Sequence, residues 1–212
     1  MKKSEQTRAH IRSAFLSLMA EKKWDKITVR EICQSASLTR GTFYQYYSDI
    51  YDLMEQLESH LLEDLSTQFQ GLRSKESPPV SLSRFLDRFN VDPPLSFLAW
   101  FQFCQEHAAE ILPLLDRAHG DPYFVKRLRT VLEEQMSFLM DRDGMPQDEL
   151  RAHFVPLLSE MHLLSVQSWL SSGEDPELTA ADIVNLLNTT RVGSVFLSWR
   201  QAGCPDQKGA TS

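Results

Sequence analysis

Residues 28–47 have the sequence TVREICQSASLTRGTFYQYY, which predicts two short helices joined by a tight turn. Thr28 and Glu31 have the spacing of a capping box, in which each side chain bonds a free backbone N–H group at the start of a helix. Thr39 is placed to begin the second helix only a few residues later. This arrangement is typical of a helix-turn-helix, whose second helix lies in the major groove of DNA.

The second helix carries side chains suited to the edges of base pairs. Arg40 can bond guanine through two N–H groups, and Gln45 can bond adenine in a similar way. Thr42 can contact a thymine methyl group or a phosphate. The alternative for Arg40 is an ordinary surface salt bridge, and the alternative for Gln45 is a solvated side chain on an exposed turn. We predict base contacts for Arg40 and Gln45.

The segment from about Ser4 to Met54 resembles the DNA-binding domain of the TetR/AcrR family of bacterial transcriptional regulators. The resemblance rests on residues 27–29 (ITV) at the opening of the first motif helix and on residues 40–44 (RGTFY) in the second. Beyond this first quarter of the chain, the length and the helical pattern fit the family. The region from about Phe97 to Leu170 is similar to the ligand domain of regulators resembling DhaS, an activator of dihydroxyacetone use.

The resemblance also implies roles for individual side chains of the motif. Phe43 and Tyr47 are expected to fill the core of the domain, and Tyr44 is suited either to the core or to contact with DNA. The expected phosphate anchors are Thr28, Thr39, Tyr44 and Tyr46.

Two positions depart from the family pattern. Ser37 stands where many members have a glycine, and it can take the left-handed backbone conformation that the turn needs at a cost of about 1 kcal/mol. Ile50 stands where a lysine usually follows the cap of the fourth helix. The chain therefore lacks one cationic contact to phosphate, and its DNA binding is expected to be weaker or to depend more on other basic residues.

The charge of the chain is divided unevenly. The 212 residues carry a formal net charge of −7, which by itself argues against a nucleic-acid partner. Residues 1–50, however, hold nine lysines and arginines against five aspartates and glutamates, whereas the remainder holds thirteen against twenty-four. A basic N-terminal part on an acidic body favours attraction to phosphate at one end of the chain.

Fold class follows from periodicity and from the signals at helix ends. Asp49 is placed to cap a long fourth helix that runs to about Gly71, and further helices are expected to begin at Asp92-Pro93, Asp121-Pro122 and Asp175-Pro176. No stretch has the sustained alternation of a strand. We predict an all-α protein with a three-helix helix-turn-helix domain at 1–48, a larger helical domain at 49–203 and a polar tail at 204–212.

The last two long helices are predicted to form a homodimer interface. One recognition helix covers only a few base pairs, so two copies on a palindromic operator supply the specificity that a single copy lacks. In the family, these helices pair in a four-helix interface. The alternative is an apolar stripe buried within one subunit. The candidate interface residues are Leu158, Met161, Trp169, Leu187, Val195, Phe196 and Trp199.

The central segment, residues 85–140, is rich in aromatic residues and methionine. The family resemblance implies a pocket here for a small-molecule effector, although core packing alone explains most of these side chains. The histidines are expected more often to be satisfied core or surface residues than ligand contacts. The candidate effector-binding residues are Phe89, Trp100, Phe103, His107, Phe124, Phe138 and His162.

Catalysis and metal binding find no support in the sequence. The chain has no HExxH sequence, no phosphate-binding glycine loop and no nucleophile elbow, so we expect no enzyme and no cofactor. Cys33, Cys104 and Cys204 lie too far apart for a metal site or a redox pair, which suggests inert thiols in a reducing cytoplasm. No export signal or membrane span is expected.

These observations favour a cytoplasmic, ligand-responsive transcriptional repressor that binds double-stranded DNA. Two alternatives remain open on the sequence alone. One is an activator of the same fold, and the other is a helical sensor or interaction protein that has lost DNA binding.

Overall fold

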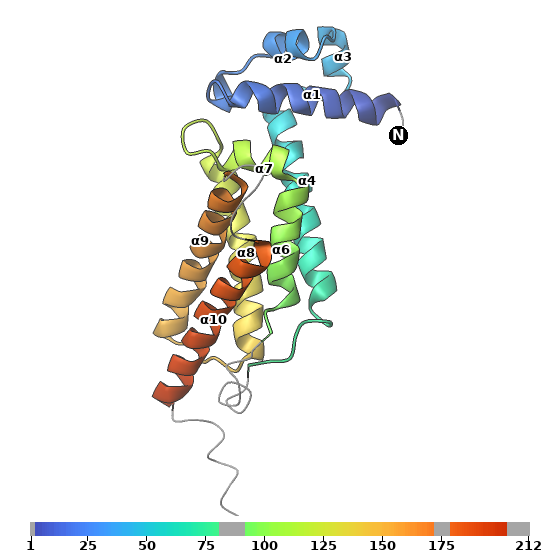
Figure 1. Cartoon of the computed structure of the whole chain (residues 1–212). Helices are drawn as coiled ribbons and strands as arrows, with labels where there is room; N and C mark the ends of the chain where they lie inside the picture. Colours follow the sequence, from blue (N-terminus) through green and yellow to red (C-terminus); the bar gives the residue numbers. More distant parts are fainter. Residues whose placement is uncertain (1–2, 81–91, 172–178, 203–212) are drawn as a thin grey trace, which may run out of the picture. The chain divides into compact units, whose positions relative to one another are not determined.

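The computed structural model describes residues 3–80, 92–171 and 179–202. Within these ranges the secondary structure consists of α-helices and one short 3-10 helix, with no strand, so the predicted all-α fold is confirmed (Figure 1). The chain divides into two compact units: unit 1 is Met1–Asp64 with His107–Leu128, and unit 2 is Leu65–Glu106 with Arg129–Ser212.

Unit 1 contains the predicted helix-turn-helix. Its helices are α1 (Lys3–Met19), η1 (Trp24–Lys26), α2 (Val29–Ser35), α3 (Arg40–Tyr44), the first part of α4 (Ile50–Leu72), α7 (Ala108–Leu115) and the start of α8 (Pro122–Arg142). Helix α1 packs against α2, η1 and α7, and α2 packs against α3 (Figure 1). Phe15, Ile32 and Phe43 are fully buried at the centre of this packing. Tyr47 is also buried, so the predicted core roles of Phe43 and Tyr47 are confirmed.

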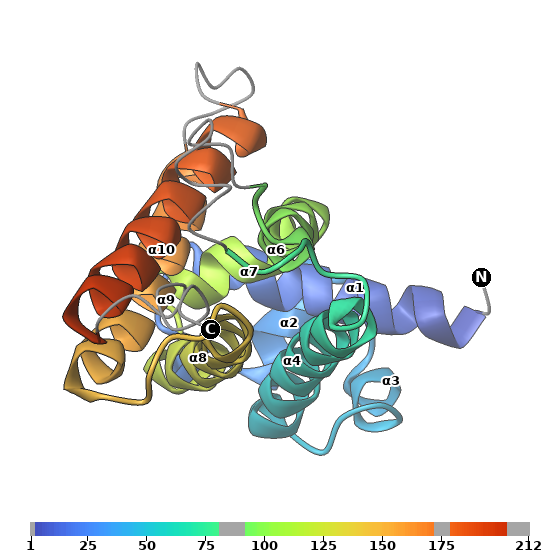
Figure 2. The same cartoon turned by 90° about the horizontal axis from the view of Figure 1, so that it is seen from below.

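Unit 2 is built from helices that lie side by side. It contains the end of α4, α6 (Leu95–Glu106), most of α8, α9 (Glu149–Ser171) and α10 (Ala180–Ala202). Helix α10 packs against both α9 and α6, and α6 also packs against α9 (Figure 2). Large apolar side chains such as Trp100, Phe101 and Leu158 fill the space between them. Burial of this apolar surface is the main contribution to stability here.

A buried ion pair crosses unit 2. Arg191 on α10 bonds Asp143, which follows α8, and each side chain is only 3% exposed. Asp143 also accepts the backbone N–H group of Val80 at 2.9 Å. Val80 belongs to an apolar cluster with Val192, Val195 and Trp199 of α10. The pair therefore joins residues that are far apart in the sequence.

The predicted helix starts at Asp49 and Asp121 are confirmed. Asp49 Oδ1 accepts the N–H group of Asp52 at 2.8 Å at the start of α4, and Asp121 Oδ1 accepts that of Tyr123 at 2.9 Å at the start of α8. Gly144 has a φ of +69° directly after α8. There the N–H group of Met145 bonds the carbonyl of Met140, which closes the last turn of the helix.

The predicted start at Asp92-Pro93 is wrong. Helix α6 begins at Leu95, and its free N–H groups at Leu95 and Ser96 are bonded by the carboxylate of Glu76, at 2.7 and 3.0 Å. A side chain nineteen residues earlier therefore replaces the local cap. The expected start at Asp175-Pro176 and the tail at 204–212 lie outside the described residues.

Two of the three cysteines lie in the described residues. Cys33 and Cys104 are buried free thiols.

Among the helices of residues 3–80, 92–171 and 179–202, none combines the length and the apolar character that a membrane crossing demands.

Candidate nucleic-acid interface

Helix α2 begins with the predicted capping box. Thr28 is in an extended conformation, and its hydroxyl accepts the N–H group of Glu31 at 3.3 Å. The Glu31 carboxylate in turn accepts the N–H group of Thr28 at 2.9 Å and its hydroxyl at 2.7 Å. The reciprocal bonds fix where α2 begins, as the sequence predicts.

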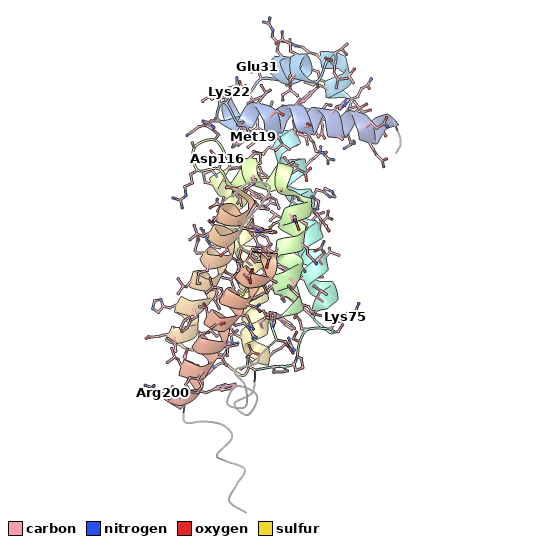
Figure 3. The ribbon with its side chains drawn as sticks, in the orientation of Figure 1. Met19, Lys22, Glu31, Lys75, Asp116 and Arg200 are labelled. Atoms are coloured by element: carbon pink, nitrogen blue, oxygen red, sulfur yellow. The ribbon has the colours of Figure 1, made fainter. Side chains whose placement is uncertain are left out.

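An ion pair that the sequence did not indicate strengthens this cap. Lys22, just after α1, donates to Glu31 Oε1 at 2.6 Å (Figure 3). The bonds from Lys22 and Thr28 lower the pKa of Glu31 from 4.5 to about 2. The carboxylate is therefore charged at neutral pH and connects the end of α1 to the start of α2.

The turn between α2 and α3 is a Schellman motif. The N–H group of Leu38 bonds the carbonyl of Cys33 at 2.9 Å, and the N–H group of Ser37 bonds that of Gln34 at 3.2 Å. Ser37 lies at the position of this motif that needs a left-handed backbone, and its φ is 54°. The prediction that Ser37 adopts this conformation is confirmed. The turn sets the direction in which α3 leaves α2.

Helix α3 is short and begins at its predicted cap. Thr39 Oγ1 accepts the N–H group of Thr42 at 3.1 Å, and the two hydroxyls lie 2.9 Å apart. Only Phe43 of this helix is buried. Arg40 and Gln45 are exposed, and Tyr44 is 56% exposed. Arg40 and Gln45, which are predicted to contact bases, therefore lie exposed at the two ends of α3, and the cap at Thr39 fixes where this helix begins.

The other predicted anchors have partners within the chain. Thr28 and Thr39 are exposed, but their hydroxyls already serve as helix caps. Tyr46 is half-buried, and the guanidinium of Arg8 lies over its ring, 5.2 Å from the centroid. Tyr46 lies just after α3, so this contact places the cationic group of Arg8, from α1, beside the C-terminal end of α3. This cation–π contact is one that the spacing of residues could not reveal.

Ile50 is the first residue of α4 and is only 9% exposed. Its side chain is part of the apolar core, as is that of Leu53 one turn later. The start of α4 is held instead by Asp49 and by Asp52, whose carboxylate accepts the N–H group of Ser48 at 2.7 Å. Ile50 therefore contributes apolar packing at a position where the family pattern has a cation.

The predicted effector residues do not all come together. His107 and Phe124 belong to unit 1, and His107 Nδ1 lies 3.0 Å from Glu110 Oε2. Phe138 of unit 2 is half-buried, with the guanidinium of Arg73 4.8 Å from its ring centroid. Phe89 lies outside the described residues. The remaining three belong to unit 2 and are buried: Trp100, Phe103 and His162.

His162 has an unusual environment on α9. It is fully buried, its Nδ1 bonds the carbonyl of Leu158 at 2.7 Å, and the ring of Phe97 meets it edge-on at a centroid distance of 4.4 Å. Burial lowers the pKa of His162 to about 4. The ring is therefore neutral at pH 7, and its buried Nε2 has no hydrogen-bond partner. Trp100 likewise has a buried Nε1 with no acceptor.

The predicted interface residues differ in exposure. Leu158, Leu187 and Val195 are fully buried within the chain, and Trp169 and Trp199 are nearly so. Met161 and Phe196 are half-buried. The large apolar side chains that are most exposed on α9 and α10 are Leu157, Leu164, Leu186 and Leu197, with exposed fractions of 52%, 49%, 62% and 43%.

Comparisons with known proteins agree with this geometry. Residues 11–57 match a family model described as bacterial regulatory proteins of the tetR family. Over 120 residues the chain is 28% identical to an HTH-type transcriptional regulator named YxbF, described as uncharacterized, from Bacillus subtilis (strain 168). That match covers 57% of this chain and 29% of the length of the relative.

Solved structures show the same fold over nearly the whole chain. A TetR transcriptional regulator from Streptococcus agalactiae 2603V has a TM-score of 0.56 and 23% identity, and the match covers 90% of this chain and 95% of that one. The dihydroxyacetone kinase operon activator DhaS has a TM-score of 0.52 and 17% identity, with 86% of this chain and 94% of that one covered. At these identities the likeness concerns the fold alone.

Proposed function

We propose that this chain acts in the cytoplasm as a ligand-responsive repressor that binds a palindromic operator. The comparisons support a DNA-binding transcriptional regulator whose N-terminal residues 11–57 match the TetR family model. The observation that carries the proposal is the surface of α3. Arg40 is exposed at the start of this helix and Gln45 at its C-cap, while the cap at Thr39 and the turn at Ser37 fix the start and direction of the helix. Long side chains with N–H groups on an exposed helix can donate hydrogen bonds to base edges in the major groove.

Two copies are proposed to bind together through α9 and α10. Leu157 and Leu164 are two helical turns apart on α9, and Leu186 and Leu197 are three turns apart on α10, so each pair occupies one face of its helix. All four are exposed in the single chain. Adjacent helices that expose large leucines form an apolar surface of the kind that marks a protein interface. The buried candidates on these helices would then support the interface from within.

Dimerisation is tested by replacing Leu186 with aspartate. The side chain is 62% exposed, so the substitution leaves the core of the single chain intact. A charge within the proposed apolar interface is expected to shift the mass measured by light scattering from that of two chains to that of one. Wild-type protein that is already monomeric at micromolar concentration would refute the proposed pairing.

The effector is proposed to bind in unit 2, near His162 and Trp100. Both residues bury a polar nitrogen that has no partner within the chain. Leaving such a group unpaired costs about 1–3 kcal/mol, which a ligand with a matching donor or acceptor would recover. Helix α4 has residues in both units, so a ligand that shifts its C-terminal part would also act on the unit that contains α3. A change in the spacing of two reading helices weakens binding to a palindrome.

DNA recognition is tested by selection from a random duplex pool, followed by titration of the selected site. Arg40→Ala is expected to weaken specific binding by about 1–3 kcal/mol, while weak binding to unrelated DNA stays nearly unchanged. Arg117→Ala is the matched control, because Arg117 is exposed in the α7–α8 connection of the same unit and its replacement changes the charge equally.

The outcomes separate the candidate functions. Equal loss on all DNA sequences would make Arg40 a phosphate anchor, and failure to select any sequence would favour an interaction protein without DNA binding. In vitro transcription from a promoter with the selected site gives the sign of regulation, since a repressor lowers the yield and an activator raises it.

A further inference from the structure

Unit 1 contains an open pocket of about 540 Å³ whose walls come from three parts of the chain. Trp24 comes from η1, Tyr51 and Glu58 come from α4, and Asp121 and Tyr123 come from the start of α8. The walls thus combine aromatic rings with carboxyl groups. This combination of groups attracts cations, because both the face of an aromatic ring and a carboxylate carry negative charge density.

Glu58 is the buried carboxyl group of this pocket, with only 3% of the residue exposed. Its Oε2 atom accepts Arg127 Nη1 at 3.4 Å, a long contact, and Arg127 also donates to Ser59 Oγ at 3.3 Å. Its Oε1 atom is buried and accepts no hydrogen bond from an N–H group or a hydroxyl. The carboxyl group of Asp121 is the neighbour that can share a proton with Glu58 when Glu58 is protonated. A buried acceptor without a donor is unfavourable, so the pocket offers a position for an additional N–H or O–H group.

The charges of the lining residues favour a positively charged occupant. Three carboxyl groups, those of Glu55, Glu58 and Asp121, line the pocket together with a single guanidinium, that of Arg127. An anion would be repelled by this excess of carboxyl groups. A metal ion is also disfavoured, since the described residues contain no group of three or more His, Cys, Asp or Glu side chains placed to hold one.

Both tyrosines of the pocket are exposed, and Trp24 is half-buried. Tyr51 is 58% exposed and Tyr123 is 64% exposed. The rings of Trp24 and Tyr51 meet edge-on at a centroid distance of 5.4 Å, and Arg127 lies 5.9 Å from the centroid of Tyr123. These exposed rings provide an apolar wall beside the carboxyl groups, against which the hydrocarbon part of a ligand can pack.

We propose that this pocket binds a small organic ammonium ion that has N–H donors and an aromatic or aliphatic body. The ammonium group donates to Glu58 Oε1 and is attracted by Asp121, while the body packs against Tyr51 and Trp24. The need for a donor at Oε1 selects a primary or secondary ammonium over a quaternary one, which has no N–H group. The site is distinct from the effector site proposed in unit 2, and its occupancy does not depend on DNA binding.

Protonation of Glu58 adds a pH dependence to this binding. Burial and the neighbouring Asp121 carboxyl raise the pKa of Glu58 to about 8, and Arg127 opposes this only in part. The other groups that face it are Glu55, the tyrosine rings and Trp24. An ammonium ion favours the ionised carboxylate, so affinity rises as pH increases toward 8. At pH values below the pKa of Glu58, the affinity for the ammonium ion falls roughly tenfold per pH unit.

The experiment uses the full chain and three probes of similar size: benzylamine, benzyltrimethylammonium and benzyl alcohol. Affinities are measured without DNA, by calorimetry and by ligand-observed NMR, at pH values from 6 to 8. Benzyltrimethylammonium carries a permanent charge. Benzylamine is a weaker base than the lysine side chain, but it remains mostly protonated up to pH 8. We expect benzylamine to bind most tightly and benzyl alcohol least. The affinity for both cations is expected to increase as the pH rises, more for benzylamine, whereas that for benzyl alcohol does not increase.

Variants locate the binding to the pocket. Glu58→Gln keeps the shape of the side chain but removes its charge, and it is expected to weaken benzylamine binding at least tenfold. Asp121→Asn is a second variant, whose amide oxygen can still cap α8. Glu63→Gln is the matched control, since Glu63 is exposed on α4 and does not line the pocket. Equal binding by Glu58→Gln and wild type, equal affinity for the amine and the alcohol, or no amine binding at millimolar concentration would each overturn the proposal.

Discussion

Replacing Ser37 with glycine is expected to stabilise the helix-turn-helix. Ser37 follows α2 with a φ of 54°, in the left-handed region that glycine adopts without strain. The serine is exposed, so removing its side chain sacrifices little packing. The hydrogen bonds of the turn are all made by backbone atoms: Leu38 N–H to the Cys33 carbonyl and Ser37 N–H to the Gln34 carbonyl. Both bonds remain in the glycine variant.

The expected gain follows from two opposing effects. A residue with a Cβ atom costs about 1–2 kcal/mol in the left-handed conformation. Glycine loses more backbone freedom on folding, which costs about 0.5–1 kcal/mol. The net stabilisation of unit 1 is therefore roughly 0.5–1 kcal/mol.

Hydrogen exchange of the Leu38 amide measures this effect at the turn itself. This N–H group bonds the Cys33 carbonyl at 2.9 Å, so its exchange requires the turn to open. The predicted gain corresponds to exchange that is about two- to fivefold slower. The matched control is Ala36→Gly one residue earlier, where φ is −82° and glycine has no strain to relieve. Glycine at position 36 is expected to destabilise the turn by about 0.5–1 kcal/mol.

The opposite signs expected at positions 36 and 37 distinguish relief of left-handed strain from a general effect of glycine on the turn. If Ser37→Gly exchanged as fast as wild type, or if both glycine variants changed the rate in the same direction, the left-handed strain at Ser37 would not limit the stability of this turn.

Two further predictions concern ion pairs. The pKa of Glu31 is about 2 in the folded chain against an ordinary value of 4.5, so its contribution to stability is present above pH 4.5 and is lost as the pH falls toward 2. Glu31→Gln cannot form the ion pair with Lys22. We therefore expect the free energy of unfolding of this variant to depend less on pH between 2 and 4.5 than that of the wild type. The same pH dependence in both proteins would contradict this prediction. Asp143→Asn leaves Arg191 buried without its partner charge and is expected to cost about 3–5 kcal/mol in urea unfolding. The double variant with Arg191→Met should recover much of this loss, and a double variant as unstable as the single one would argue against an unpaired charge as the cause.

Signals that act over a few residues could be predicted from the sequence. The caps at Thr28, Thr39 and Asp49 and the left-handed turn at Ser37 each depend on atoms within about five residues, and the structure confirms them. The helix-turn-helix and its exposed Arg40 follow from these local rules.

Only the tertiary structure decided which distant residues meet. Glu76 caps α6 in place of Asp92 because folding brings it beside Leu95, and Arg191 on α10 is paired with Asp143, which follows α8. The pocket around Glu58 depends in the same way on segments separated by more than sixty residues. Sequence periodicity indicates that a side chain is buried, but the partner it finds there depends on how the helices pack. Burial beside these partners determines whether an ionisable side chain is charged and whether a buried polar atom lacks a hydrogen bond. Binding sites are built from such groups.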